Sequence, residues 1–198
     1  PLVTRSDGSK FGKSESGEAL WLDINKTSSY ELYQYFINAE DDKVIEYLKK
    51  LTFLTKEEIE ELEKSLNEHP EERKAQKALA KEIITFLHGE EEYKKALHIS
   101  ESLFSDKIWE LTADEIIESI KDVPRFDVKD NTLLIDLLVD NKIVSSKREA
   151  REMITSGAIS INNQKSTDLE KVVTTKDAIE GKVLLIKKGK KNYFMGLM

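Results

Sequence analysis

The sequence predicts an α+β chain, in which an all-helical region is followed by a small α/β module. Apolar residues recur at helical spacing through the middle of the chain, and hydroxyl–glutamate pairs three residues apart mark helix starts. After Gly157 the apolar period changes to two, which indicates strands. We expect an opening segment over residues 1–25, a helical domain over 26–122 and the α/β module over 123–198.

The helical region divides into several helices. Ser28, Thr55 and Thr112 each precede a glutamate by three residues, which fits a capping box, and His69-Pro70 interrupts the pattern. Gly89 separates two later helices. The longest run has one apolar face, made of Ala75, Ala78, Leu79, Ile83, Phe86 and Leu87.

Two features of this region invite functional interpretations that we consider weaker than structural ones. The run "EEIEELE" (residues 57–63) fits the solvent-facing side of an amphipathic helix. Aromatic side chains could stack on bases, but at helical spacing they usually pack into a core. We therefore expect most of this aromatic group to be core: Tyr30, Tyr33, Tyr35 and Phe36.

The α/β module begins near Pro124. "TLLIDLLVDN" (residues 132–141) predicts a short helix, and a second helix begins at Ser146, capped with Glu149, and ends at Gly157. "AISIN" predicts a strand, followed by a turn at Asn162-Asn163. "KVLLIKKGKKNYFMGLM" predicts two strands joined at Gly189.

Composition excludes several classes of protein. The chain has 198 residues, 39% of them apolar and none of them cysteine, so disulfides and thiolate metal sites are absent. The three histidines, His69, His88 and His98, lack metal-ligand spacing, and no bound metal is expected. Apolar runs are too short for a membrane span and no secretory signal begins the chain, which favours a cytoplasmic protein.

Charge is distributed unevenly along the chain. Residues 40–122 carry 13 Lys/Arg against 23 Asp/Glu, whereas residues 123–198 carry 14 against 10. Lys147 and Arg151 share a helix face, Arg148 lies beside them, and Lys165 follows the Asn162-Asn163 turn. Four more lysines crowd the last hairpin beside Asn192 and Tyr193: Lys187, Lys188, Lys190 and Lys191. This pattern favours RNA binding over a merely solvated surface.

The opening stretch "SDGSKFGKS" (residues 6–14) suggests phosphate binding, but it does not fit the nucleotide-cradling loop G-x-x-x-x-G-K-[ST]. Three residues, rather than four, separate Gly8 from Gly12. The expected strand before the loop and the helix after it are also missing from the pattern. Lys10 and Lys13 therefore need another explanation.

The tail resembles a known RNA-binding module. "SSKREAREMITSGAISINNQK" (residues 145–165) is similar to the small module of a ribosomal small-subunit protein and of several RNA-modifying enzymes. The usual Asn-Gly turn is Asn162-Asn163 here, and asparagine also tolerates positive φ. The matching positions are Ser146, Arg148, Ala150, Arg151, Gly157 and Ile161-Asn162.

The opening loop extends this resemblance to a family of enzymes. "KFGKS" (residues 10–14) resembles the tyrosyl subgroup's form of the Lys-Met-Ser-Lys-Ser signature of class I aminoacyl-tRNA synthetases. Three further segments resemble bacterial tyrosyl-tRNA synthetases: "WLDINKTSSYELYQYFIN", "DDKVIEYLKKLTF" and "KKGKKNYFMGLM". The likeness covers essentially all 198 residues in the same order.

The resemblance implies a carboxyl-terminal portion of such an enzyme: the end of the catalytic domain, the anticodon-binding domain and the terminal RNA-binding module. The family's nucleotide-binding fold precedes the lysine loop and is not in this sequence, so the chain alone is expected to be inactive. In the family, lysines matching Lys10 and Lys13 stabilise charge on the pyrophosphate leaving ATP, and a hydroxyl matches Ser14. Magnesium is expected with ATP and none is expected to be held by this chain.

The resemblance also implies the partners. Tyrosine and ATP would bind the complete enzyme, and tyrosine tRNA would contact the helical domain with its anticodon and the tail with its long variable arm. The family dimerises through its nucleotide-binding domain, which leaves open whether this chain is a monomer. The expected tRNA contacts, mostly to phosphates, are Lys147, Arg148, Arg151, Lys165, Lys190, Lys191 and Asn192.

Two other classes of protein compete with this interpretation. A non-enzymatic, ribosome-associated RNA-binding adaptor would explain the tail equally well, but not the opening loop or the helical middle. A purely structural helical scaffold would leave the basic tail without a purpose. A titration with tyrosine tRNA against an unrelated hairpin RNA separates the first of these from a synthetase.

Overall fold

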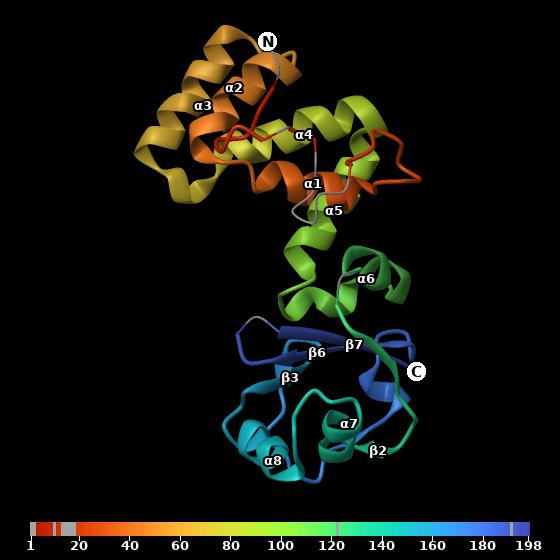
Figure 1. Ribbon diagram of the computed structural model, residues 1–198. Helices are drawn as coiled ribbons and strands as arrows, with labels where there is room; N and C mark the ends of the chain where they lie inside the picture. Colours follow the sequence, from red (N-terminus) through yellow and green to blue (C-terminus); the bar gives the residue numbers. More distant parts are fainter. Residues whose placement is uncertain (1–2, 10, 13–18, 122, 191) are drawn as a thin grey trace. The chain divides into compact units, whose positions relative to one another are not determined.

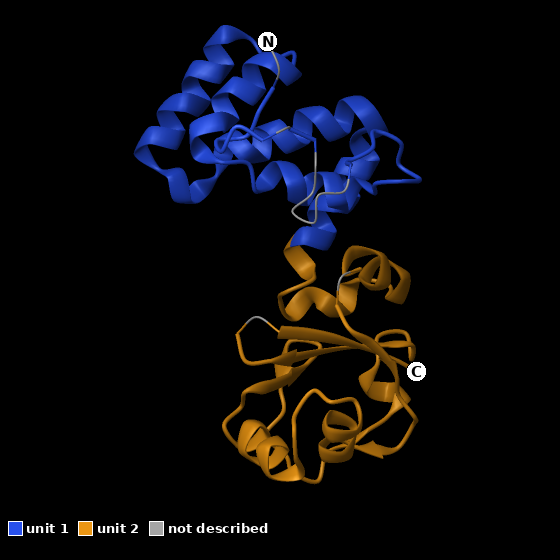
Figure 2. Cartoon of the chain, viewed as in Figure 1, with its two compact units in different colours: residues 1–100 blue, residues 101–198 orange. Residues whose placement is uncertain are grey.

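The protein was described from a computed structural model, which places residues 3–9, 11–12, 19–121, 123–190 and 192–198 (Figure 1). The chain forms two compact units, Pro1–Ser100 and Glu101–Met198 (Figure 2). Helices fill the first unit and a mixed sheet with helices fills the second, which confirms the α+β class. Among the described residues, every helix is too short or too polar to serve as a membrane span.

Unit 1 is built around α4 (Lys74–His88), which packs against three other helices (Figure 1). These are α1 (Ser29–Ile37), α2 (Asp41–Leu51) and α3 (Lys56–Glu68). A short 3₁₀ turn, η1 (Pro70–Glu72), precedes α4, and α5 (Glu90–Ser102) follows it. The predicted capping boxes at Ser28 and Thr55 are confirmed, and so is the break at His69-Pro70.

Most of the predicted aromatic group lies in the core of unit 1, whereas one residue of the apolar face predicted for α4 does not. Tyr30, Tyr33 and Phe36 are buried, whereas Tyr35 is half-buried. On α4, Phe86 was predicted to lie on the buried face but is 69% exposed. It occupies the last turn of the helix, where its ring contacts Phe53 at 5.3 Å between ring centroids. An exposed aromatic pair thus replaces the expected core contact.

Unit 2 contains a five-stranded sheet in the order β1-β7-β6-β3-β4. The strands are β1 (Arg125–Asp127), β3 (Ile159–Ile161), β4 (Gln164–Lys165), β6 (Val183–Lys188) and β7 (Asn192–Leu197). β1 is parallel to β7 and the other neighbours are antiparallel. A second small sheet pairs β2 (Thr132–Leu133) with β5 (Val172–Val173). The sequence did not predict β1, β2, β4 or β5 as strands, and Thr132-Leu133 was expected to be helical.

The two faces of the main sheet are covered by different elements of unit 2 (Figure 1). Leu184 and Ile186 face a core that includes α7 (Leu134–Asp140) and α8 (Lys147–Thr155). Because side chains alternate along a strand, Leu185 faces the other way. On that side lie η2 (Asp106–Glu110) and α6 (Ala113–Ser119), where the capping box at Thr112 is confirmed. A third 3₁₀ turn, η3 (Thr175–Asp177), precedes β6.

Local backbone geometry confirms the turns predicted for unit 2. Gly157 has a φ of 67°, and the amide of Ala158 donates to the carbonyl of Met153, which is the pattern of a helix closed by a glycine. Asn162 and Asn163 both have positive φ, 46° and 64°, as a two-residue hairpin turn requires. The turn at Gly189 joins β6 to β7 as predicted.

Candidate nucleic-acid interface

Helix α8 carries three exposed cations on its outer side. Its inner side is fixed by Ala150 and Ile154, which are fully buried in the core shared with the sheet. Lys147 Nζ lies 2.6 Å from Asp136 Oδ1, and Arg148 Nε lies 3.1 Å from Glu152 Oε1. The Arg148–Glu152 pair is exposed on both sides, and such pairs contribute only about 0–1 kcal/mol, whereas Asp136 Oδ1 is buried. Arg148 can therefore exchange Glu152 for another anion at little cost.

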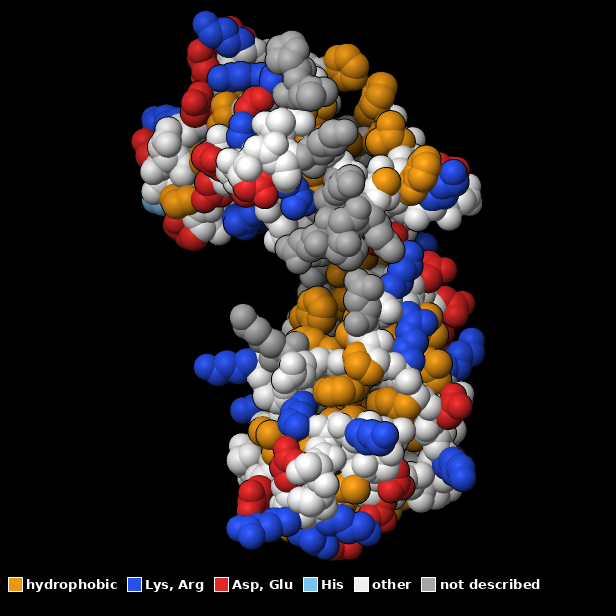
Figure 3. Space-filling view, in the orientation of Figure 1, with side chains coloured by type: hydrophobic (Ala, Val, Ile, Leu, Met, Phe, Trp, Pro, Cys, Tyr) orange, Lys and Arg blue, Asp and Glu red, His pale blue; other side chains and the backbone are white. Residues whose placement is uncertain are grey.

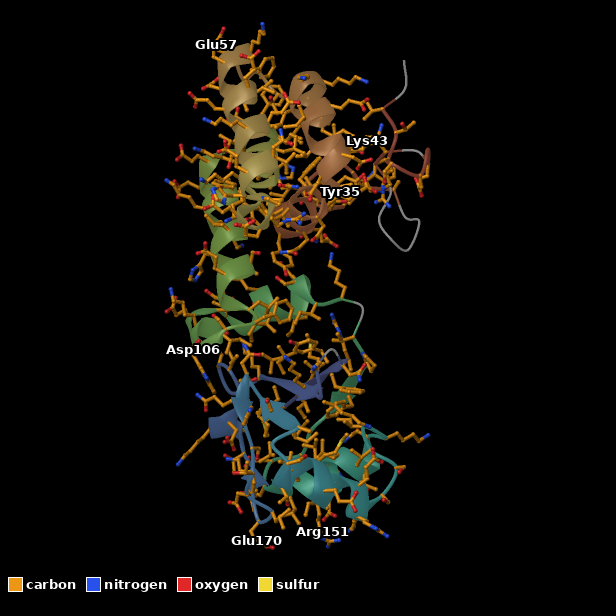
Figure 4. The ribbon with its side chains drawn as sticks, turned by 90° about the vertical axis from the view of Figure 1, so that its left-hand side faces the viewer. Tyr35, Lys43, Glu57, Asp106, Arg151 and Glu170 are labelled. Carbon is orange, nitrogen blue, oxygen red and sulfur yellow. The ribbon has the colours of Figure 1, made fainter. Side chains whose placement is uncertain are left out.

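Arg151 completes this group on α8. Within the part of the chain that the structure describes, it makes no ion pair, and it lies on the side of unit 2 away from Asp106 (Figure 4). Figure 3 shows Lys and Arg side chains, with acidic ones among them, gathered over the end of unit 2 where α8 lies. Lys147 and Arg151, which the sequence predicts to share a helix face, are both exposed on α8, as is Arg148.

The start of α8 is held by an unusual variant of the predicted cap. Ser146 accepts a hydrogen bond from the amide of Glu149, as expected, but the Glu149 carboxylate turns to Ser145. It accepts from the Ser145 amide at 2.7 Å and hydroxyl at 2.6 Å, and Lys188 Nζ lies 3.1 Å away. These donors, the Ser145 hydroxyl first, lower the pKa of Glu149 to about 2. The reciprocal half of the predicted capping box was therefore wrong.

A second basic group lies on the opposite face of the sheet. Lys165 on β4 pairs with Ser160 on β3, Ser160 pairs with Lys187 on β6, and Lys187 pairs with Tyr193 on β7. Directly opposed residues of an antiparallel ladder point to the same face, so the four form one row across the sheet. Lys187 Nζ lies 5.3 Å from the centre of the Tyr193 ring.

Lys188 does not belong to this group, although the sequence placed it with its neighbours in a basic hairpin. It points to the helical face, where Nζ donates to the Ile143 carbonyl at 2.8 Å and to Glu149. Its side chain is 23% exposed. The alternation of the strand separates Lys187 from Lys188, so counting lysines overestimated the basic surface.

Phe11 and Gly12, which lie between the two lysines of the opening loop in the sequence, are held by aromatic side chains of unit 1. The Phe11 ring lies 4.6 Å from the Tyr47 ring and 5.5 Å from the Tyr35 ring, measured between ring centroids. The Gly12 amide donates to the Tyr35 hydroxyl at 3.0 Å, and the Tyr47 hydroxyl donates to the Thr4 carbonyl. Burial raises the pKa of Tyr47 to about 12. These contacts anchor Phe11 and Gly12 to α1 and α2.

The two units of the chain match two families of known proteins. Residues 1–105 match the family model of tRNA synthetases class I (W and Y), and residues 115–196 match that of the tyrosine–tRNA ligase SYY-like C-terminal domain. The chain belongs to the class I tRNA synthetases of the W and Y type. Its resemblance to bacterial tyrosyl-tRNA synthetases is thereby confirmed.

Individual relatives of this chain are named tyrosine–tRNA ligases. Tyrosine–tRNA ligase 1 of Bacillus anthracis is 54% identical over 98% of this chain and 47% of the relative. Tyrosine–tRNA ligase of Geobacillus kaustophilus is 52% identical over 98% and 46%. The chain thus spans about half the length of the curated relatives it matches. The solution structure of a tyrosyl-tRNA synthetase C-terminal domain is 41% identical, with a TM-score of 0.40, over 48% of this chain and 97% of that one.

The predicted site residues of this synthetase chain fall into three sets. Lys10, Lys13, Ser14 and Lys191 lie outside the described residues. Lys147, Arg148 and Arg151 are brought together on α8. Lys165, Lys190 and Asn192 are exposed on or beside the sheet, on β4, the β6–β7 turn and β7. Lys187 was not among the predicted tRNA contacts; strand register, which sequence alone does not fix, places it beside them.

Proposed function

We propose that this chain is the carboxyl-terminal, tRNA-binding part of a tyrosine–tRNA ligase. In the whole enzyme, tyrosine would attack the α-phosphate of ATP, and the tyrosyl group would then pass to tyrosine tRNA. The observation that carries the proposal is the exposed cationic surface of α8, in a unit that matches the C-terminal domain of this ligase family. The relatives at 54% and 52% identity support the same activity.

Unit 2 would bind the long variable arm of the tRNA. Lys147, Arg148 and Arg151 would contact phosphates from α8, and Arg148 would exchange its exposed ion pair with Glu152 for the more highly charged RNA backbone. Lys165 would add a contact from the other face of the sheet, and Lys190 with its neighbour Lys191 would add contacts near the β6–β7 turn. Asn192 would contribute from the helical face, because its ladder partner is Lys188. Unit 1 would face the anticodon through a few placed contacts, because residues 40–122 are strongly acidic.

The opening loop would act on ATP. Lys10 and Lys13 would place two ammonium groups against the departing pyrophosphate, and Ser14 would donate a hydroxyl hydrogen bond. The anchoring of Phe11 and Gly12 on Tyr35 and Tyr47 supports this role, because it limits where the neighbouring lysines can reach. Magnesium would arrive with the ATP phosphates.

The wider organisation is part of the same proposal. Residues 1–25 would end the catalytic domain, residues 26–122 would form the anticodon-binding domain and residues 123–198 the terminal RNA-binding module. The complete enzyme would be a cytoplasmic homodimer joined through its nucleotide-binding domain. A monomer is the simplest state for a chain without that domain.

RNA binding by α8 is tested with the double variant Arg148→Ala, Arg151→Ala. Each lost phosphate contact lowers the slope of log affinity against log salt by about 0.9, so the double variant should lose about 2. The measurement is fluorescence anisotropy with tyrosine tRNA from 50 to 300 mM KCl. A matched control removes two exposed lysines elsewhere in unit 2, Lys129→Ala with Lys176→Ala, and should keep the slope. An unchanged slope in the arginine variant would place the RNA surface elsewhere.

Enzymatic competence is tested by pyrophosphate exchange. We expect this chain alone, mixed with tyrosine, ATP and magnesium, to catalyse no exchange above background. The complete enzyme is the positive control, and its Lys13→Ala variant should lose adenylate formation far more than tyrosine affinity. Measurable exchange by the chain alone would refute the proposal that it is inactive without the nucleotide-binding domain.

A further inference from the structure

Phe104 is an exposed aromatic residue whose backbone is fixed by the hairpin turn of unit 2. It is 53% exposed, and its ring packs on the Tyr193 ring with 5.2 Å between centroids and 55° between planes. Asn163 Nδ2 donates to the carbonyls of Leu103 and Ser105, the two neighbours of Phe104, at 3.0 and 2.8 Å. A ligand that stacks on Phe104 therefore does not have to order the backbone first.

Cations extend from this aromatic pair across the sheet. Tyr193 stands at one end of the row that continues through Lys187 and Ser160 to Lys165. Lys187 Nζ lies over the Tyr193 ring at 5.3 Å from its centroid. The surface thus combines one open aromatic face, a hydroxyl and two ammonium groups. Aromatic faces stack unpaired bases and ammonium groups bind the phosphates between them, which is the usual recognition of single-stranded RNA.

We infer that Phe104, supported by Tyr193 and Lys187, is a stacking platform for one unpaired base of RNA, with Lys165 on a neighbouring phosphate. The inference rests on the proposed RNA binding by unit 2 and adds a base contact to it. A protein partner fits less well, because lysines are depleted from the cores of protein interfaces and this row contains two.

The test compares two RNA hairpins that differ by one unpaired adenine, replaced by 2-aminopurine for fluorescence. The full chain should bind the hairpin with the unpaired base more tightly and quench its fluorescence. Phe104→Ala should weaken that binding by about 5- to 150-fold, the usual range for loss of one stacked base. The fully paired hairpin should be bound as before, and the salt slope should not change, because phenylalanine contacts no phosphate.

Three further variants make the test specific. Phe104→Trp should keep the affinity and the quenching. Phe104→Leu keeps an apolar contact with Tyr193 but no aromatic face, so it should lose both the added affinity and the quenching. If the alanine variant does not fold, the leucine variant tests the platform in its place. Phe53 of unit 1 is another exposed phenylalanine (82%), so Phe53→Ala is the matched control. It should change neither the affinity for the hairpin nor the quenching. Lys165→Gln should lower the salt slope by about 0.7–0.9, because it removes the proposed phosphate contact.

The outcomes separate this inference from the proposed function. If the unchanged chain binds neither hairpin at 50 mM KCl, RNA binding itself fails and the platform fails with it. If it binds both hairpins but Phe104→Leu binds them equally well, only the platform is overturned. If the unchanged chain self-associates in sedimentation and Phe104→Ala abolishes association without affecting RNA, the face is a protein contact and the inference is wrong.

Discussion

Lys187 and Lys188 are adjacent residues of β6 with different roles. Lys187 lies over the Tyr193 ring on the exposed side of the sheet, whereas Lys188 reaches across the helical side to Glu149 and the Ile143 carbonyl. A phosphate would meet the first and not the second. The charge of one lysine therefore indicates an RNA contact only after it is known which face of the sheet the lysine lies on.

Glu149 provides a pH-dependent prediction at this scale. Its pKa falls from the usual 4.5 to about 2, so the carboxylate adds stability at all pH values above 4.5 and loses it as pH falls through 2. Glu149→Gln should lower the urea midpoint at pH 7, and the difference from the unchanged protein should shrink steadily below pH 4.5. The measurement is urea unfolding followed by circular dichroism between pH 7 and pH 3.

Glu152→Gln is the matched control for this prediction. Glu152 lies on the same helix, and among the residues that the structure describes its carboxylate pairs only with Arg148, whose side chain is 89% exposed. Its substitution should change the free energy of unfolding by no more than about 0.5 kcal/mol at any pH. A Glu149→Gln deficit that stays constant down to pH 3 would show that the carboxylate charge is not responsible.

At the scale of elements, β7 is confined between neighbours on both sides. It pairs with β1 in parallel and with β6 antiparallel. At Gly196 a methyl group would lie 2.7 Å from Val128 Cγ2 and 3.3 Å from Phe126 Cε2. Val128 is buried, so it has little room to move. Only glycine fits where β1 approaches β7.

Gly196→Ala should therefore destabilise the protein by about 1–3 kcal/mol, the usual cost of overpacking a core. Val128→Ala alone should also destabilise it, because a buried methyl pair is lost. The double variant should lose less free energy of unfolding than the sum of the two single variants, because alanine at position 128 leaves room for the methyl group at position 196. Chemical unfolding of all four proteins measures this coupling. Strict additivity would show that the close approach at Gly196 does not limit the packing.

At the scale of the whole molecule, the compact unit that contains the sheet begins before the change in composition near Pro124. Residues 101–121 cover one face of the sheet, and their buried side chains include four large aliphatic ones: Leu103, Ile108, Leu111 and Ile116. The Ala113 amide also donates to Glu180, and Arg125 donates to the carbonyl of Ile117. The proposed RNA-binding module over residues 123–198 would lack this cover.

Two shorter chains test this point. Residues 101–198 alone should unfold cooperatively, whereas residues 123–198 alone should not. Each fully buried aliphatic side chain contributes about 1.5–3 kcal/mol, and a domain has only about 5–15 kcal/mol in total. Thermal unfolding followed by circular dichroism distinguishes the two. Equal midpoints would favour residue 123 as the true domain limit.

Much of this fold could be predicted from the sequence because the responsible forces act over a few residues. Ser28, Thr55 and Thr112 cap helices through glutamates three positions away, and the glycine at 157 closes α8. The change of apolar period correctly located the strands β3, β6 and β7. The short strands β1, β2, β4 and β5 were missed, because two or three residues contain too little periodicity to recognise.

The sequence by itself determined which residues begin and end the main helices, where the Asn162-Asn163 turn lies and which side chains carry the charge that RNA would meet. Only the tertiary structure decided which of those charges share a surface. It set α8 and Lys165 on opposite sides of one sheet and brought Phe104 against Tyr193, far along the chain. Capping and turn geometry act between neighbours in sequence, whereas strand register and packing depend on the simultaneous burial of distant apolar residues.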